Sequence, residues 1–473
     1  MVFSGTIFLL LFFPLFLLTY FLSPGKLRNY VLLLFSIVFY AWGAPTFIFI
    51  LIASTITTFY IVQLMHRASD ERRKKIYLLT ALVLNVGVLL YFKYANFFME
   101  NFNSVLESFG ARELKWTAVA LPIGISFYTF QCLSYCVDVY RGVSPPLKMA
   151  TDFLLYIIMF PQLIAGPIVR FNTIATQITE RSSEPSDRIL GFYRFTIGLA
   201  KKVLIANVMG KYADMYMGRE LMNLSSTEAW LGLLAYSFQI YFDFAGYSDM
   251  AIGIGRMIGF SFPENFNNPY VSKSITEFWR RWHMTLSAWM RDYLYIPLGG
   301  SRVDTKLRLF MNLWIVFLIS GFWHGASWNF VIWGAYHGLF LVLDRLFLKK
   351  LLERAGGAIA TMFTFLVAIL GWVVFRLETF DQAMTYYSRL FAFDFTPIKF
   401  GNILDMAIVM ALAFFFSFIT IFSFGRKLET LVFYEEYSSR RYVVVGILVV
   451  LLFFLSVGSI AATGFNPFIY FRF

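Results

Sequence analysis

The stretch FMNLWIVFLISGFWHG, residues 310–325, decides the class of fold, because an uncharged apolar run leads directly into a histidine. Runs of this kind suit the hydrocarbon core of a membrane. Across the 473 residues, hydrophobic residues make up 59% and charged residues only 14%. A soluble globular domain carries about 25% charged residues. We therefore predict an all-α polytopic membrane protein.

Charge-poor stretches that are long enough to span a bilayer, or nearly so, recur along the whole chain and predict about 11 transmembrane helices. They lie near 7–22, 30–42, 46–64, 76–94, 118–139, 151–169, 229–242, 307–321, 327–347, 357–375, 403–424 and 442–463. Two further segments, 185–222 and 272–300, mix charged and aromatic residues at helical spacing. This pattern favours interfacial or re-entrant hairpins over spans.

Prolines and glycines are predicted to interrupt several of these helices. They are Pro122, Pro161, Pro167, Gly246 and Gly253. A broken helix at membrane depth is tolerated only where protein or a water-filled cavity satisfies the freed backbone groups. The middle of the chain is therefore expected to enclose a cavity.

Basic residues indicate how the chain is oriented. They cluster in the loop 66–75 and again at Arg440 and Arg441, before the last apolar run. Because cytoplasmic loops retain Lys and Arg, both termini are expected on the extracytoplasmic side, including the aromatic tail 465–473. The net charge of +12 fits such loops and anionic lipid headgroups, so no nucleic-acid partner is expected. No soluble domain has room between the spans, which predicts one membrane domain over 1–473.

His324 is the first candidate for chemistry. A neutral imidazole can accept a proton from a hydroxyl near neutral pH, as acyl transfer requires. Gly321 and Gly325 would allow close backbone approach by a substrate, and Trp323 would supply a rigid wall. The alternative is a satisfied core histidine. His337, further along the same region, is a weaker candidate.

A second histidine, His283, lies in a segment predicted to be one amphipathic helix over 275–298. Phe278, Trp282, Leu286, Trp289 and Tyr293 would share its apolar face. Arg280 and Arg281 either extend their charges to the membrane interface or bind the phosphates of a nucleotide-bearing donor. Trp279 and Trp282, like Trp323, are expected to form walls of the channel through which the donor enters.

Two carboxylates, Asp243 and Asp249, stand among apolar residues in the segment 239–255. A carboxylate at membrane depth usually faces a cavity or a partner. We predict a polar network satisfied by Tyr241, Tyr247 and Ser248. Asn265 joins this network and lies in NFNNPY (265–270), which reads as a capped turn. The histidines lack metal-ligand spacing, so no metal is predicted.

Several long blocks resemble the membrane-bound O-acyltransferase family, and within it the bacterial branch of the membrane subunit of alginate O-acetylation. They are LPIGISFYTFQCLSY (121–135), FPQLIAGPIVRF (160–171), YFDFAGYSDMAIGIG (241–255), ENFNNPYVSKSITEFWRRWHMTLSAWMRDYLYIPLGG (264–300), SGFWHGASWNFVIWGAYHG (320–338) and FNPFIYFRF (465–473). The resemblance runs over the whole chain. It implies a ring of helices around a central channel.

In this resemblance the family's essential histidine falls on His324, and a second recurrent polar residue falls on His283. It implies that acetyl-CoA is the donor substrate, with no resident cofactor. The acetyl group would cross the bacterial inner membrane to an extracytoplasmic polysaccharide with the help of a serine-hydrolase-like (SGNH) partner. Tyr470, in the aromatic tail, would carry the acyl group as a transient ester, or else is a residue of the interfacial aromatic belt.

Two rival functions stay open from the sequence. One is D-alanyl transfer to teichoic acid, whose membrane subunit shares this architecture. The other is a non-enzymatic polysaccharide or acyl transporter, because broken helices around a central cavity also describe transporters.

Overall fold

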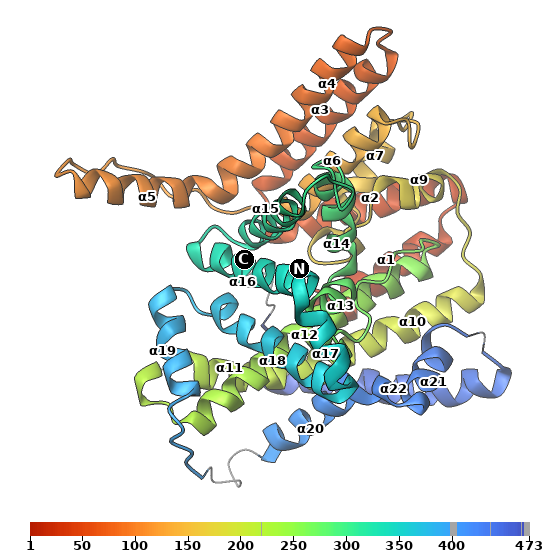
Figure 1. Cartoon of the computed structure of the whole chain (residues 1–473). Coiled ribbons are helices and arrows are strands. Elements are labelled where there is room, and N and C mark those ends of the chain that lie inside the picture. The colour runs from red at the N-terminus through yellow and green to blue at the C-terminus, as the bar shows by residue number, and fades with distance from the viewer. Residues whose placement is uncertain (219, 398–403, 436, 465, 468–473) are drawn as a thin grey trace. The chain divides into compact units, whose positions relative to one another are not determined.

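The computed structural model describes the chain except residues 219, 398–403, 436, 465 and 468–473. Every regular element in this described part is a helix (Figure 1), so the all-α prediction is confirmed. Contacts divide the chain into two units. The first holds 1–187, 255–262 and 325–327, and the second holds 188–254, 263–324 and 328–473. Each unit is described by itself, and the predicted single domain over 1–473 stays a prediction.

Seven helical runs in the described residues are long and apolar enough to cross a membrane, which confirms a multi-pass membrane protein. They are α3 (Phe47–Arg67), α4 with α5 (Glu71–Ser108), α15 (Lys306–His324), α16 with α17 (Trp328–Ala355), α18 (Gly357–Arg376), α20 with η10 (Leu404–Ile421) and α22 (Ser439–Thr463). A shorter apolar run covers Phe8–Leu22. The remaining stretches predicted as spans form helices that are shorter or more polar.

The first unit contains the helices up to α9, among them α1 (Phe13–Leu22), α2 (Arg28–Gly43), α6 (Ile125–Tyr140), α7 (Ala150–Ile158), α8 (Phe160–Leu163) and α9 (Phe171–Thr179). Phe160 lies at the centre of its aromatic core. Ring centroids 5.0 to 6.3 Å away belong to Phe3, Phe8, Phe12, Phe16 and Phe39. The predicted breaks at Pro122, Pro161 and Pro167 are confirmed: α7 ends at Ile158, Pro161 opens α8, and the other two prolines stand outside helices.

In the second unit the segment predicted as a hairpin over 185–222 is instead one helical run as far as Met217. It consists of α10 (Pro185–Ala200), the π-helical turn η4 (Lys201–Ala206) and α11 (Asn207–Met217). The charged residues that suggested an interfacial location face partners inside this unit, as Lys202 does at 2% exposure. The predicted hairpin is therefore wrong, whereas the predicted interfacial location stays a prediction.

The long helix α12 (Ser226–Met257) passes through Gly246 and Gly253 without a break, contrary to the prediction. A Cβ atom on Gly246 would lie 2.6 Å from the carbonyl oxygen of Gly198, and one on Gly253 would lie 2.5 Å from that of Gly191. Small residues let two membrane helices bring their backbones together. These glycines therefore form a seam between α10 and α12, defined by Gly191, Gly198, Gly246 and Gly253, and do not end the helix.

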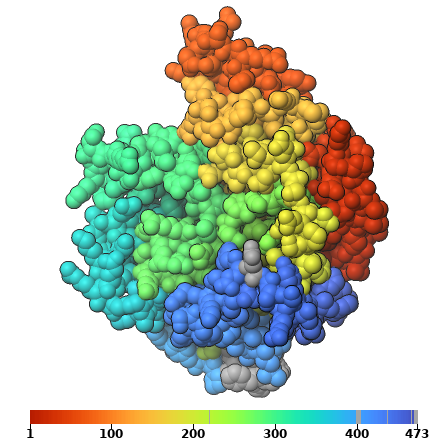
Figure 2. Space-filling model, turned by 90° about the vertical axis from the view of Figure 1, so that its right-hand side faces the viewer, coloured from red at the N-terminus to blue at the C-terminus, as the bar shows by residue number. Residues whose placement is uncertain are grey.

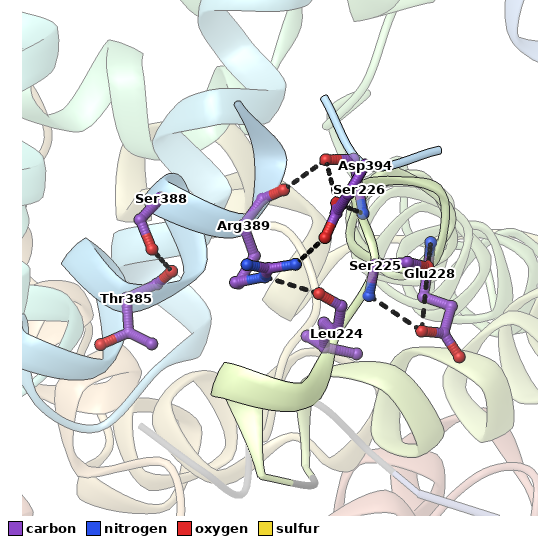
Figure 3. Close-up of polar contacts among 8 residues, drawn as sticks. All are labelled: Leu224, Ser225, Ser226, Glu228, Thr385, Ser388, Arg389 and Asp394. Carbon is purple, nitrogen blue, oxygen red and sulfur yellow. Dashed lines mark hydrogen bonds and ion pairs between the residues drawn. The ribbon is translucent and has the colours of Figure 1, made fainter. Parts of the chain in front are cut away.

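The N-terminal end of α12 is fixed to α19 (Phe380–Leu390) by the polar cluster in Figure 3. The backbone N–H and the hydroxyl of Ser226 both donate to Asp394 at 2.8 Å. Arg389 donates to the carbonyl oxygen of Leu224 at 2.6 Å and also pairs with Asp394. These hydrogen bonds, first those from Ser226, lower the pKa of Asp394, so a carboxylate faces the positive end of the α12 dipole.

The C-terminal helices α21 (Ser423–Phe433) and α22 cover another part of this unit. On the face drawn in Figure 2, their blue surface adjoins green surface of the same unit. Asn268, in the loop before α13, donates to Glu429 of α21 at 2.8 Å. This hydrogen bond ties that loop to α21.

Candidate active site

The segment predicted as one helix over 275–298 breaks at His283. It forms α13 (Ile275–Arg281), α14 (Met284–Met290) and the π-helical turn η7 (Arg291–Tyr295). His283 itself has left-handed backbone angles, φ 44° and ψ 55°. Such a conformation costs a non-glycine residue about 1–3 kcal/mol and tends to occur at functional sites. The predicted continuous apolar face is therefore wrong.

The loop from Asn265 to Asn267 holds this break open. The N–H of Met284 donates to the carbonyl oxygen of Asn265 at 2.9 Å, and the N–H of Asn267 donates to that of Arg281 at 3.0 Å. Two backbone groups beside the break thus have partners, which a buried break requires. The loop and the two short helices fix the direction in which His283 points.

His283 and His324 line one pocket, whose volume is about 210 Å³. His324 is the last residue of α15, and its side of the pocket includes Val316 and Ser320. Trp279, Trp282 and Leu286 supply much of the apolar wall on the other side. The sequence placed the two histidines in the same site by resemblance, and the structure brings them together.

Arginines line the same pocket, but only one of the two arginines predicted to bind the donor is among them. Arg280 is one of the lining residues, whereas Arg281 is not. Arg281 instead donates to Glu277 at 2.9 Å and to the carbonyl oxygen of Asn267 at 3.1 Å. Arg291 and Arg345 also line the pocket, although sequence reasoning assigned them no role. Arg345 comes from the turn after α16, which no local motif connects to His283.

The side chain of Asn265 determines the tautomer of His283. Its Oδ1 lies 2.9 Å from Nδ1 of His283 and accepts from the Thr285 hydroxyl at 2.8 Å, while its Nδ2 donates to the Ser248 hydroxyl at 3.0 Å. Because the amide oxygen only accepts, Nδ1 of His283 must carry the proton. Its Nε2 then presents a lone pair, and within the described ranges this atom has no hydrogen-bond partner.

Burial, and to a lesser degree the nearby His324, lowers the pKa of His283 well below its usual value. His283 lies outside the candidate spans and is 1% exposed. Its ring is therefore neutral at physiological pH. A neutral imidazole with a fixed tautomer can accept a hydrogen bond or a proton at Nε2.

Aromatic rings surround His324. Their centroids lie 4.9 Å away for Trp323, 5.2 Å for Trp333 and 5.3 Å for Phe375. Trp323 supports both histidines, since its ring also lies 6.3 Å from that of His283, but it is not among the residues that line the pocket. It packs behind His324, whereas the prediction made it a channel wall.

Gly321 serves the packing of helices and not the approach of a substrate. A Cβ atom there would lie 2.2 Å from the carbonyl oxygen of Phe330 and 3.0 Å from the Cα atom of Gly334. The glycine thus lets α15 and α16 (Trp328–Leu343) bring their backbones into contact. This close contact holds the C-terminal turn of α15, where His324 stands.

His337 on α16 is buried in an aromatic cage defined by Trp279, Trp333 and Tyr336, with ring centroids at 4.8, 5.0 and 5.1 Å. It is fully buried and does not line the pocket. A Cβ atom on Gly371 would lie 2.7 Å from its Nε2. His337 therefore has the contacts of a packing residue.

The two aspartates of α12 pair with cations on the neighbouring helical run, and not with the tyrosines and serine that the sequence suggested. Asp249 lies 2.6 Å from Arg194 and 2.7 Å from Lys201. Asp243 lies 2.8 Å from Lys202. These cations leave neither carboxylate as an uncompensated buried charge, which would be strongly destabilising.

Tyr470, predicted as a candidate acyl carrier, lies outside the described residues. The described residues contain no group of three or more His, Cys, Asp or Glu that is placed to hold a metal ion.

Comparison with known proteins assigns the family. The family model of the membrane-bound O-acyltransferases matches residues 37–380. The probable alginate O-acetylase AlgI of Azotobacter vinelandii is 39% identical over 100% of both chains. The peptidoglycan O-acetyltransferase of Helicobacter pylori is 36% identical over 81% of this chain and 78% of its own. The teichoic acid D-alanyltransferase of Streptococcus thermophilus is 29% identical over 48% of this chain and 58% of its own. With a pocket that holds two buried histidines, the chain belongs to the membrane-bound O-acyltransferase family and is an O-acyltransferase of the membrane.

Proposed function

We propose that the protein moves an acetyl group from cytoplasmic acetyl-CoA across the membrane for the O-acetylation of an extracytoplasmic polysaccharide. The observation that carries this proposal is the single pocket in which His283, His324 and three arginines meet. A relative that is similar over the full length of the chain is named as a probable alginate O-acetylase, which favours acetyl as the group and a polysaccharide as the final acceptor.

The arginines supply the site for the donor. Arg280, Arg291 and Arg345 line the pocket beside apolar side chains. Guanidinium groups bind phosphates through paired, charge-assisted hydrogen bonds. They hold the phosphates of CoA, while the apolar wall of Trp279 and Leu286 receives the acyl thioester. A pocket of about 210 Å³ accommodates a short acyl group with part of the pantetheine arm.

Transfer then follows general-base chemistry. His324 accepts the proton of the attacking hydroxyl, and the hydroxyl oxygen forms a bond to the thioester carbonyl carbon. The carbon–sulfur bond breaks, and the CoA thiolate leaves and recovers the proton from His324. His283, whose Nε2 offers a lone pair, orients the hydroxyl or His324. The site needs no metal in this scheme.

The attacking hydroxyl is either that of the acceptor or the phenol of Tyr470, which would carry the acetyl group as an ester to a serine-hydrolase-like (SGNH) partner. That partner completes the transfer to the polysaccharide. Mass spectrometry of the C-terminal peptide after incubation with acetyl-CoA tests this step. A gain of one acetyl group on Tyr470 supports it, and an unmodified peptide in protein held without its partner removes it.

The orientation in the bacterial inner membrane rests on charge. Arg72, Arg73, Lys74 and Lys75 stand in the first turns of α4, after the short loop that follows α3. Cytoplasmic loops and the adjoining helix ends retain such residues, which supports a cytoplasmic donor side and termini outside. Labelling of single introduced cysteines from each side of the membrane measures this orientation.

The decisive experiment gives purified protein, reconstituted in lipid, radiolabelled acetyl-CoA as the sole donor. Acetyl transfer that depends on His324 supports the proposal. A protein that reacts only with a D-alanyl-charged carrier protein has the activity named for the teichoic acid relative, which is 29% identical over 48% of this chain. Polysaccharide that moves across the membrane with unchanged acetyl content after His324→Ala would show a transporter instead.

A further inference from the structure

Lys202 is a buried cation whose ammonium group contacts three polar groups. The side chain stands in η4 and is 2% exposed. It pairs with Asp243 at 2.8 Å and donates to Oδ1 of Asn207 at 2.8 Å. The third acceptor is the carbonyl oxygen of Pro467, 265 residues further along the chain. One ammonium group thus joins α12, α11 and the segment after α22.

The hydrogen bond from Lys202 to the carbonyl oxygen of Pro467 forms only when the C-terminal segment is docked. An ammonium group offers three donors, and a buried donor without a partner costs about 1–3 kcal/mol, or more when it is charged. Asp243 and Asn207 belong to helices and satisfy two donors whatever the C-terminal segment does. The remaining donor is left for the carbonyl oxygen of Pro467.

Asn207 and the proline fix which residue docks. Nδ2 of Asn207 donates to Oδ1 of Asn466 at 3.4 Å, so adjacent residues of the segment contact the same short stretch of helix. A proline also restricts the residue before it to extended conformations, which limits the ways in which this dipeptide can present its acceptors. The site therefore contacts the side chain of Asn466 and the backbone carbonyl of Pro467 at the same time.

The docking point lies close to the candidate active site along α12. Asp243, which holds Lys202, is followed by Phe244, whose ring lies 4.7 Å from that of His283. One helical turn on, Ser248 accepts from Asn265, the residue that fixes the tautomer of His283. The helix that anchors the C-terminal segment is thus the helix that backs the histidine pocket.

We propose that Lys202, Asp243 and Asn207 form an intramolecular docking site that recognises Asn466 and Pro467 of the C-terminal segment. Docking itself does not depend on acetyl transfer. Its consequence, that these two residues are held against the helix that backs the histidine pocket, rests on the proposed function.

The test measures how accessible the segment is. Cys132 and Cys136, both buried, are replaced by alanine, and Asn466→Cys introduces a single thiol. This change removes the 3.4 Å contact with Asn207 and keeps the bond from Lys202 to Pro467. The rate of maleimide labelling in detergent is then compared between this parent and the double variant Lys202→Met, Asp243→Leu. Replacing both charges avoids an unpaired buried carboxylate, which would unfold the protein for another reason.

We expect the double variant to elute as a folded protein and to label about tenfold faster than the parent, because the docked segment is released. The matched control is Arg376→Met with Asp214→Leu, which removes another ion pair of the same unit, at 2.6 Å. Its labelling rate should equal that of the parent.

Equal labelling of the parent and the double variant would overturn the proposal, and so would a control that labels as fast as the double variant. Neither outcome involves an acetyl donor. Loss of docking with normal acetyl transfer, or docking without any transfer, therefore separates this proposal from the proposed function.

Discussion

Two buried histidine environments lie on neighbouring helices of the same unit, and only that of His324 lines the candidate active-site pocket. His324 and His337 are both surrounded by aromatic rings, and both contact Trp333. His324 borders a pocket of about 210 Å³ together with His283, whose tautomer Asn265 fixes. His337 is not among the residues that line this pocket. Burial of a histidine among aromatic rings is thus a property of packing, whereas a place in the wall of a pocket beside a histidine of fixed tautomer distinguishes the environment of His324.

The largest expected effect comes from removing the imidazole of His324. His324→Gln should lower the initial rate of polysaccharide acetylation about a thousandfold, because general-base catalysis contributes about 10²–10⁴-fold. Reconstituted protein with labelled acetyl-CoA and its partner measures this rate. Folded His324→Gln protein that keeps more than a tenth of the parent's rate would contradict the role of His324, so folding is checked by size-exclusion chromatography.

The next effect tests the fixed tautomer of His283. Asn265→Leu removes the amide oxygen that Nδ1 of His283 contacts at 2.9 Å, and this should lower the rate about 10–100-fold, as the loss of an orienting partner does elsewhere. The matched control is Asn268→Leu. Asn268 lies close to Asn265 in the sequence, and this change removes its 2.8 Å hydrogen bond to Glu429 of α21. If both variants lose activity equally, the loop matters for folding and the tautomer argument fails.

The paired arginines give a smaller effect that falls on substrate affinity. Arg280→Gln should raise the KM for acetyl-CoA about tenfold, because a hydrogen bond to a charged group contributes about 1.5–3 kcal/mol. Arg281→Gln should change KM less than about twofold, since this guanidinium is engaged by Glu277 and lies outside the pocket. A rise in KM that is larger for Arg281→Gln than for Arg280→Gln would contradict the assignment of Arg280 as the arginine that binds the donor.

The smallest effect is expected at His337. His337→Leu should change the acetylation rate less than about twofold, because it keeps a side chain of similar volume in an apolar cage. Thermal unfolding followed by tryptophan fluorescence should shift by only a few degrees, in either direction. A loss of rate that approaches that of His324→Gln would erase the distinction between the two environments.

The class of fold could be predicted from composition, since a chain with 59% hydrophobic and 14% charged residues has few alternatives to membrane helices. Helix breaks at prolines were also predictable, because proline lacks an N–H donor. The glycines were not. The sequence around Gly246 suggests a helix break. The reason why this position must be small is the carbonyl oxygen of Gly198, on a helix far away in the sequence but adjacent in space.

In the candidate site, the pairing of His283 with His324 followed from the family's sequence blocks and not from spacing. The left-handed backbone of His283 escaped prediction because the residues on both sides have helical periodicity, and the bonds that impose the break come from Asn265 and Asn267. The partners of Asp243 and Asp249 were missed for the same reason. Their cations stand on a run that was read as an interfacial hairpin.

The seam of glycines between α10 and α12 also limits how this sequence can diverge. Residues that face lipid can exchange one apolar side chain for another at little cost, but a single added methyl group at Gly198 would lie 2.5 Å from the carbonyl oxygen of Gly246. Such a change would push two backbones apart and stretch the ion pairs that cross between them. Inactive variants are therefore expected to arise at these glycines, because the two helices would lose their alignment.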